Sequence, residues 1–175
     1  EKTSMKENVN GSVLIVGGGI AGMQSALDLA NSGYYVYLLE KSPAIGGVMA
    51  QLDKTFPTND CAMCIMSPIL VEVGRHVNIE LVTYADLERV DGNPGNFHVT
   101  INKRAAYIDA DLCTGCGECS QNCPVSLPDA YNLNLIDRKA TYKQYAQAIP
   151  INYTIQKTDK APCRLACPAG INVQG

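Results

Sequence analysis

The sequence lacks a run of basic residues, a long apolar segment and an apolar region at its N-terminus. The formal net charge is −3 and no basic run of five or more occurs, which argues against a nucleic-acid partner. The longest apolar runs are only a few residues, too short for a membrane-spanning helix. Residues 1–10 are polar and mixed in charge, unlike an export signal. We therefore expect a cytoplasmic chain without a membrane span.

Histidine is scarce, and its placement leaves little room for acid–base chemistry. The two histidines are His76, near the end of an expected helix, and His98, within an expected strand. Both positions favour a structural role. We therefore expect chemistry that requires no conventional acid–base residues.

Cysteine, by contrast, is abundant. The 175 residues include eight cysteines, which in a secreted miniprotein would indicate disulfides. The missing export pattern and the tight C-x2-C pairs favour metal clusters instead. A hydrophobic content of 46% supports a packed core, and the length fits one domain with a small insert. Because the chain starts at Glu1 and stops at Gly175 directly after a motif, we expect it to be part of a longer polypeptide.

The first part of the sequence predicts a β-α-β unit. Residues 12–16 form a short apolar run, and residues 20–31 have apolar positions at helical spacing that Gly33 ends. Residues 35–39 form a second buried strand, which Glu40 closes. Further along we expect a loop over 42–60, a short helix over 67–74 that begins around Pro68, a strand over 79–83, and a hairpin of strands 86–90 and 97–101.

Three glycines follow the first strand as G-x-G-x-x-G, namely Gly17, Gly19 and Gly22. The pattern permits a tight turn, close approach of backbone to a pyrophosphate and close helix–strand packing, while the helix N-terminus stabilises the phosphates. Glu40 lies 18 residues beyond Gly22, where a carboxylate accepts hydrogen bonds from ribose hydroxyls. The pattern predicts a dinucleotide site; the competing interpretation is a glycine turn without function.

The segment "EKSPAIGG", residues 40–47, favours FAD over NAD as that dinucleotide. Its second glycine pair is similar to that of FAD-dependent pyridine-nucleotide reductases, where it lets the loop pass close to the flavin side. Lys41 lies in this segment and is given no separate role. The residues predicted at the cofactor are Gly17, Gly19, Gly22, Glu40, Lys41, Gly46 and Gly47.

The stretch "DLCTGCGECSQNCPV" has the C-x2-C-x2-C-x3-C-P spacing of bacterial ferredoxins. Gly115 and Gly117 within it allow backbone N–H groups to approach the sulfides of a [4Fe–4S] cubane. Zinc is the alternative, but cysteines at two-residue gaps followed by Cys-Pro suit a cubane better than separated zinc knuckles. The predicted ligands are Cys113, Cys116, Cys119 and Cys123.

This run cannot complete two clusters alone. In two-cluster ferredoxins the first three cysteines bind one cubane and the fourth binds the other. The remaining ligands must come from Cys61, Cys64, Cys163 and Cys167, or from chain outside this sequence. For Cys61 and Cys64, cluster ligation, a redox-active dithiol and inert packing remain three open interpretations. The tail pair, in "APCRLACPAG", has the C-x3-C-P spacing of half a further cluster site.

Several stretches together resemble the A-type subunit of heterodisulfide reductase and its bacterial relatives over residues 12–153. They are "VLIVGGGIAGMQSALDLANSGY", "LLEKSPAIGGVMAQLDKTFPTNDCAMCIMSPILVEVGRH", "PGNFHVTI" and "CTGCGECSQNCPV". The tail, "KAPCRLACPAGINVQG", departs from this pattern and looks like the entry to the iron–sulfur helical domain of the glutamate synthase small subunit.

The resemblance implies an α/β fold: an incomplete Rossmann-like, thioredoxin-reductase-like FAD-binding domain with an inserted ferredoxin-like α+β segment. We expect the N-terminal part of the FAD domain over 1–104, the [4Fe–4S] insert over 105–150, and a linker with the start of a further iron–sulfur domain over 151–175.

The function implied is electron transfer between FAD and [4Fe–4S] clusters within an oxidoreductase complex, and some members of the family bifurcate electron pairs at the flavin. The implied partners are other subunits, with a ferredoxin or a nicotinamide cofactor as electron donor or acceptor. Two alternatives from other classes stay open. One is a nicotinamide-dependent disulfide oxidoreductase using Cys61 and Cys64, and the other is a non-catalytic ferredoxin-like carrier.

Overall fold

The computed structural model describes residues 11–157 and 166–169. The chain divides into two compact units, of which the first comprises Glu1–Ala105 and Tyr145–Pro150. The second unit comprises Ala106–Gln144 and Ile151–Gly175. The six residues 145–150 therefore belong to a different unit from the residues on either side of them.

A three-stranded parallel sheet, in the order β1-β2-β3, organises the first unit. Its strands are β1 (Ser12–Val16), β2 (Tyr35–Glu40) and β3 (Ile79–Thr83). Helix α1 (Ile20–Asn31) joins β1 to β2, as parallel neighbours require a crossover. These elements confirm the predicted β-α-β unit and place the C-terminal ends of β1 and β2 side by side.

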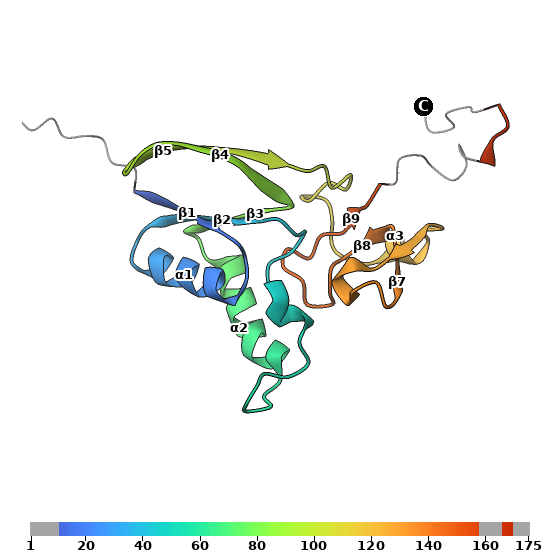
Figure 1. The fold of residues 1–175 in the computed structure, drawn as a ribbon, viewed down its shortest axis with the longest axis horizontal. Helices are drawn as coiled ribbons and strands as arrows, with labels where there is room; N and C mark the ends of the chain where they lie inside the picture. The colour runs from blue at the N-terminus through green and yellow to red at the C-terminus, as the bar shows by residue number, and fades with distance from the viewer. Residues whose placement is uncertain (1–10, 158–165, 170–175) are drawn as a thin grey trace, which may run out of the picture. The chain divides into compact units, whose positions relative to one another are not determined.

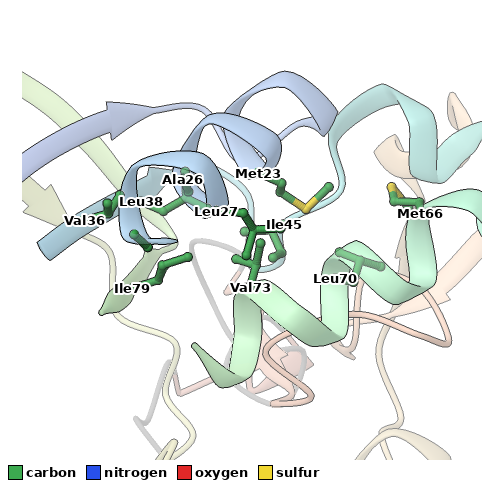
Figure 2. Packing of buried hydrophobic residues seen from close by; sticks show 11 residues of the cluster. Met23, Ala26, Leu27, Val36, Leu38, Ile45, Met66, Leu70, Val73 and Ile79 are labelled. Carbon is green, nitrogen blue, oxygen red and sulfur yellow. The ribbon is translucent and has the colours of Figure 1, made fainter. Parts of the chain in front are cut away.

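The core of the first unit lies between the sheet and its two helices (Figures 1 and 2). Helix α1 and helix α2 (Ala62–Arg75) each bury one stripe of apolar residues at helical spacing. The residues of this core are Met23, Ala26, Leu27, Ala30, Val36, Leu38, Ile45, Met66, Leu70, Val73 and Ile79. Ile45 comes from the loop after β2, so this loop is held by the core itself.

Helix α2 corrects the prediction of a helix confined to 67–74. The helix begins five residues earlier, at Ala62, so Pro68 lies inside it rather than in its first turn. Proline removes one backbone hydrogen bond from a helix interior. Here Ala62 and Met66, both fully buried, continue the apolar stripe of Leu70 and Val73 across that gap.

A long antiparallel hairpin faces the side of the sheet opposite the helices (Figure 1). It consists of β4 (Ala85–Asn93) and β5 (Asn96–Lys103), with a bulge between Leu87 and Arg89. The predicted hairpin is confirmed, and each strand extends one to three residues beyond its predicted bounds. Between the hairpin and the sheet lies an apolar cavity of about 710 Å³, lined by Ser12, Val13, Leu14, Tyr37, Leu39, Val82, Val90, Gly95, Phe97, Val99 and Ile101.

Among the described residues of the first unit, the remaining helical segment is the short 3-10 helix η1 (Gly47–Gln51), within the stretch after β2. No helix within the described residues is both long enough and apolar enough to cross a membrane.

The second unit is built from short elements. They are α3 (Glu118–Gln121), β6 (Ser126–Pro128), η2 (Ala130–Asn132), β7 (Asp137–Lys139), β8 (Thr141–Tyr142) and β9 (Thr154–Ile155). Strand β6 pairs with β7 and β8 pairs with β9, both antiparallel. A nearly buried ion pair, with Asp129 Oδ1 3.3 Å from Arg138 Nε, braces the unit. Asp129 also accepts hydrogen bonds from Tyr131 N and Asn132 Nδ2.

The connection between β8 and β9 is shared by the two units. Its residues 145–150, hereafter the 145–150 strap, belong to the first unit, whereas Ile151 and Tyr153 belong to the second. In the second unit a Cβ atom on Gly115 would lie 3.1 Å from the carbonyl oxygen of Ile151. On Gly117 it would lie 3.0 Å from the Tyr153 hydroxyl, so this part of the connection packs closely on the cysteine run.

Candidate functional site

The glycine turn after β1 has the geometry that the sequence pattern predicts. Gly17 has a φ of +105°, and its N–H donates to Leu39 O at 2.7 Å, which ties the turn to β2. A Cβ atom on Gly22 would lie 1.9 Å from Gly17 O, so only glycine fits there. A Cβ on Gly19 would meet nothing within 4 Å, so open space adjoins the turn at this position.

Helix α1 begins at this open space. Gly19 is its N-cap, with no side-chain capping hydrogen bond and no acidic residue in the first turn. The first N–H groups of a helix lack partners within the helix and carry its positive partial charge. A dinucleotide pyrophosphate fits this arrangement, because it supplies both the acceptors and the negative charge.

Glu40 lies at the base of the turn, at the end of β2. Its Oε2 accepts a hydrogen bond from Gly18 N at 2.6 Å, and its Oε1 accepts two from Ser42, from N and Oγ, each at 2.7 Å. An ionised carboxylate has about four acceptor positions, so one remains for a ribose hydroxyl beside these three bonds. Ser42, which orients Glu40, escaped the sequence prediction; its position two residues after the acidic residue was the available signal.

The loop over residues 40–47, hereafter the 40–47 loop, folds back onto the glycine turn. Gly46 N donates to Gly18 O at 2.7 Å, and a Cβ atom on Gly47 would lie 2.9 Å from Gly19 Cα. Gly46 and Gly47 both have positive φ, +128° and +56°, which glycine adopts without strain. The structure thus brings together Gly17, Gly19, Gly22, Glu40, Gly46 and Gly47.

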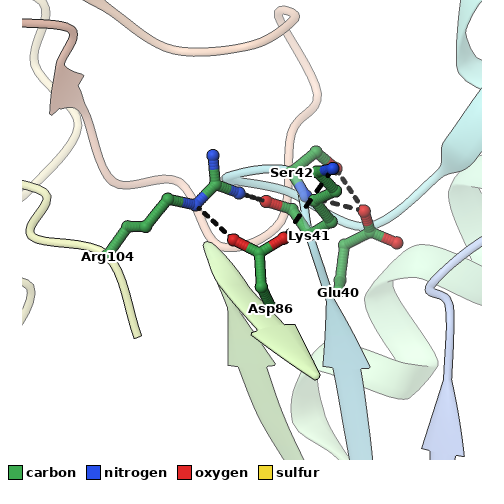
Figure 3. Close-up of polar contacts among 5 residues, drawn as sticks. All are labelled: Glu40, Lys41, Ser42, Asp86 and Arg104. Carbon is green, nitrogen blue, oxygen red and sulfur yellow. Dashed lines mark hydrogen bonds and ion pairs between the residues drawn. The ribbon is translucent and has the colours of Figure 1, made fainter. Parts of the chain in front are cut away.

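Lys41 points away from this group. Its side chain is 80% exposed, and its Nζ lies 3.8 Å from Asp86 Oδ1 (Figure 3). Its backbone carbonyl instead accepts a hydrogen bond from Arg104 Nη2. Arg104 and Asp86 are two further residues that sequence reasoning missed, because Arg104 directly follows β5 and Asp86 lies in β4, far from the motif.

The cysteine run forms an irregular loop followed by the short helix α3. Gly115 and Gly117 take positive φ values of +72° and +89°, and Gly117 is the N-cap of α3. Cys116 and Cys119 are exposed, whereas Cys113 and Cys123 are half-buried. A cubane suits this donor set, since it takes one thiolate on each of several irons. Within the described residues, no three cysteine, histidine or acidic side chains converge as they would around a single metal ion.

The surroundings of Cys123 favour its ionised form. Burial raises the pKa of the Cys123 thiol, but hydrogen bonds with Thr141, Val125 and Ala140 outweigh burial and hold the pKa below its usual value. The thiolate is the form of cysteine that binds iron. The environment of Cys123 therefore matches the role of a cluster ligand.

The other cysteines lie apart from this run in sequence. Cys61 and Cys64 form a disulfide at the start of α2, with Cα atoms 5.2 Å apart and both residues exposed. Cys61 is the N-cap, and its sulfur accepts a hydrogen bond from Cys64 N at 3.1 Å. Their ligation of a cluster, which stays a prediction, requires the reduced pair. Cys167 is half-buried, and Cys163 lies outside the described residues.

The two histidines have structural surroundings. His76 Nδ1 accepts a hydrogen bond from Asn78 N at 3.1 Å, and its Nε2 lies 3.2 Å from Asn31 Oδ1, which links the ends of α1 and α2. His98 lies on β5 opposite Asp91 of β4. Neither is near the glycine turn or the cysteine run in sequence.

Comparison with known families covers the whole of this region. The family model for FAD-dependent oxidoreductases matches residues 12–107, more than half of the chain. The chain belongs to this family. A model of the 4Fe-4S binding domain matches residues 106–126, which contain the four cysteines of the run. These matches confirm the predicted oxidoreductase class and the two predicted cofactor classes, FAD and [4Fe–4S] clusters.

Curated relatives match most of this chain. The first of two A-type iron-sulfur subunits of the CoB–CoM heterodisulfide reductase of Methanopyrus kandleri is 57% identical over 147 residues, covering 84% of this chain and 22% of that protein. The corresponding iron-sulfur subunit of Methanocaldococcus jannaschii is 53% identical over 165 residues, covering 93% of this chain and 25% of that protein. The A-type subunit of the H(2):CoB-CoM heterodisulfide,ferredoxin reductase of Methanothermobacter thermautotrophicus is 51% identical over 160 residues, covering 91% of this chain and 24% of that protein.

The resemblance to the A-type subunit of heterodisulfide reductase is thereby confirmed. The chain spans about a quarter of the length of these relatives. The resemblance of the tail to the glutamate synthase small subunit stays a prediction, because most of that segment lies outside the described residues.

Proposed function

We propose that this chain carries electrons between FAD and [4Fe–4S] clusters as part of a heterodisulfide-reductase-like oxidoreductase complex. One observation carries the proposal. A single chain holds both a glycine turn with Glu40 bonded at its base and a four-cysteine ferredoxin run. Neither an isolated ferredoxin nor a simple flavoprotein needs both features.

For the flavin site, the proposal assigns each residue of the turn a task. Gly17 and Gly22 shape the turn, and Gly19 leaves the space in which backbone N–H groups meet the pyrophosphate. Glu40 accepts hydrogen bonds from ribose, held in place by Gly18 N and Ser42. Gly46 and Gly47 let the 40–47 loop pass close to the cofactor, and Lys41 contributes its backbone to the same loop. When bound, FAD exchanges electrons in pairs with one partner and singly with another.

For the clusters, Cys113, Cys116 and Cys119 are assigned to one cubane and Cys123 to a second. The missing ligands come from Cys61, Cys64, Cys163 and Cys167 or from chain beyond this sequence. Hydrogen bonds and burial around the sulfur atoms set cluster potentials. Ligand thiols persist in a reducing compartment, so the proposal places the chain in the cytoplasm.

The partners are proposed to be further subunits of the complex. One relative is named as a heterodisulfide,ferredoxin reductase, which supports a ferredoxin as one electron acceptor or donor. A nicotinamide cofactor is the alternative small-molecule partner. The proposal includes division of an electron pair at the flavin between two acceptors as a property to be measured in the assembled complex.

Anaerobic reconstitution of the full-length protein tests the proposal. We expect bound FAD and an EPR signal on reduction. We also expect about four iron atoms and about four acid-labile sulfides for each cubane. Zinc without sulfide would overturn the cluster assignment. Glu40→Gln should weaken FAD binding about tenfold or more, since a hydrogen bond to a charged group is lost, and should leave the EPR signal unchanged. Glu80→Gln, an exposed glutamate on β3, is the matched control.

The Cys61–Cys64 disulfide favours a second candidate, a thiol–disulfide step at the start of α2. In such a step two electrons and two protons convert the disulfide to two thiols, with reduced flavin as the electron source. Cys61→Ser should then abolish thiol-linked activity and leave iron content unchanged. A fall in iron content instead would identify Cys61 as a cluster ligand.

A further inference from the structure

The 40–47 loop is held in place from two sides by residues that flank the cysteine-bearing segment 106–144. Arg104 lies two residues before that segment, and Tyr145 comes directly after it. Each donates a side-chain hydrogen bond to a backbone carbonyl of the same loop, Arg104 to Lys41 and Tyr145 to Ile45. Both contacts lie within the first unit.

On the first side, Arg104 is fixed before it reaches the loop. Its Nε lies 3.1 Å from Asp86 Oδ2 (Figure 3). Its guanidinium carbon lies 4.2 Å from the centre of the Tyr84 ring. Tyr84 is itself tied in, because its N donates to Ser42 O at 2.9 Å and its O accepts from Arg104 N at 2.9 Å. The planar guanidinium thus has an ion pair, an aromatic face and the Lys41 carbonyl as simultaneous partners.

On the second side, the 145–150 strap packs against Ile45 and Gly46 of the loop. Beside the hydrogen bond from the Tyr145 hydroxyl, Ile45 N donates to Ile149 O at 2.9 Å. A Cβ atom on Gly46 would lie 2.6 Å from the Tyr145 hydroxyl, so the tyrosine stands directly against that glycine. Ile149 packs on α2, where a Cβ on Gly74 would lie 2.8 Å from its Cγ2, and this anchors the strap.

These contacts are transmitted to the glycine turn. Glu40 and Gly46, near the two ends of the loop, bond to the N–H and the carbonyl of Gly18, at 2.6 and 2.7 Å. A displacement of the Lys41 or Ile45 carbonyl therefore moves the groups that would contact ribose and flavin. Packed protein of this kind has little room to absorb such a shift locally.

We propose that Arg104 and Tyr145 are positioning residues for the flavin site, and that the two flanks of the cysteine-bearing segment thereby complete that site. The inference rests on the proposed function, since it assigns the 40–47 loop to FAD. Neither side chain is required to touch the cofactor. Each instead holds one backbone carbonyl of the 40–47 loop, and other atoms of that loop are proposed to contact FAD.

The test uses the full-length protein reconstituted anaerobically with iron, sulfide and FAD. Tyr145→Phe removes only the hydroxyl, and Arg104→Gln removes the positive charge and the N–H donors of the guanidinium group. We expect each to raise the Kd for FAD about 3- to 10-fold, the effect of losing one hydrogen bond. We also expect an altered visible circular dichroism spectrum of FAD at saturation, which lowered stability alone would not change. Tyr34→Phe and Arg89→Gln, exposed residues away from the loop, should match the wild type.

The outcomes separate cleanly. An unchanged Kd and flavin spectrum in both variants overturns the inference. A rise in Kd that only follows a lower folded fraction, measured by thermal unfolding, also overturns it. If Arg104→Gln does not fold, Tyr145→Phe decides. Wild-type protein that binds iron and no FAD would refute the proposed function instead, before the variants are compared.

Discussion

At the scale of single residues, the glycines of the turn serve two separable purposes. A Cβ at Gly22 would meet backbone at 1.9 Å, so this glycine is required by the fold. A Cβ at Gly19 would meet open space, and Gly19 has an extended backbone with φ of −75°, which alanine adopts readily. We therefore attribute the glycine at position 19 to the proposed cofactor site rather than to the fold.

Two alanine substitutions distinguish these purposes. Gly19→Ala should leave the unfolding free energy of the FAD-free protein within about 0.5 kcal/mol of wild type and abolish measurable FAD binding, because the methyl group occupies the pyrophosphate's approach. Gly22→Ala should destabilise the FAD-free protein by about 1–3 kcal/mol or more. Urea unfolding and flavin fluorescence titration measure the two effects. Equal destabilisation by both substitutions would contradict this division.

Tyr131 makes the stability of the second unit sensitive to alkali. Burial, and then the charge of Asp129, raise the pKa of Tyr131 from 10.0 to about 12. Between these values the unfolded chain loses the phenol proton while the folded chain keeps it, so proton loss favours unfolding. The contribution of protonated Tyr131 to the free energy of unfolding is complete below pH 10 and is lost as the pH approaches about 12. Thermal unfolding from pH 9 to 11.5 should show a shallower decline for Tyr131→Phe than for wild type. Tyr107→Phe, an exposed tyrosine of the same unit, should keep the wild-type decline.

At the scale of elements, helix α2 carries much of the core of the first unit. Leu70 is 1% exposed, whereas its neighbour Val71 is 41% exposed. Leu70→Ala should lower the unfolding free energy by about 2–5 kcal/mol through lost burial and a residual cavity. Val71→Ala should cost less than about 1 kcal/mol. Chemical denaturation followed by circular dichroism compares the two, and similar losses would show that this face assignment is wrong.

Local patterns in the sequence were enough to predict the elements around the glycine turn. Strands β1 and β3 and helix α1 have the predicted bounds, because apolar periodicity and glycine punctuation there agree with the packing. The start of α2 was missed, because the prediction relied on the preference of proline for the first turn of a helix. That preference takes no account of the burial of Met66, which lies before Pro68. Tyr145 was missed because its partner, Ile45, is 100 residues away and no periodicity marks the strap.

At the scale of the whole molecule, the distribution of cysteines between clusters determines how iron is lost on mutation. If Cys113 and Cys123 bind different cubanes, Cys113→Ser and Cys123→Ser should perturb different EPR signals. Each should lower the iron content by up to about four atoms per chain, and the double variant should lose both signals. The same signal lost in both single variants would place the two residues on one cluster. Ser120→Ala, within the same run, is the control that keeps all four thiols.

The separation between Ile45 and Tyr145 also has a consequence for biosynthesis. A ribosome that adds about 5–20 residues per second needs about 5–20 s to pass from Ile45 to Tyr145, which is 100 residues further on. All four cysteines of the run have been synthesised before the tyrosine that completes the loop. If Tyr145 positions the flavin site as proposed, this order would let iron–sulfur loading begin on the nascent chain before the Tyr145 hydrogen bond to Ile45 can form.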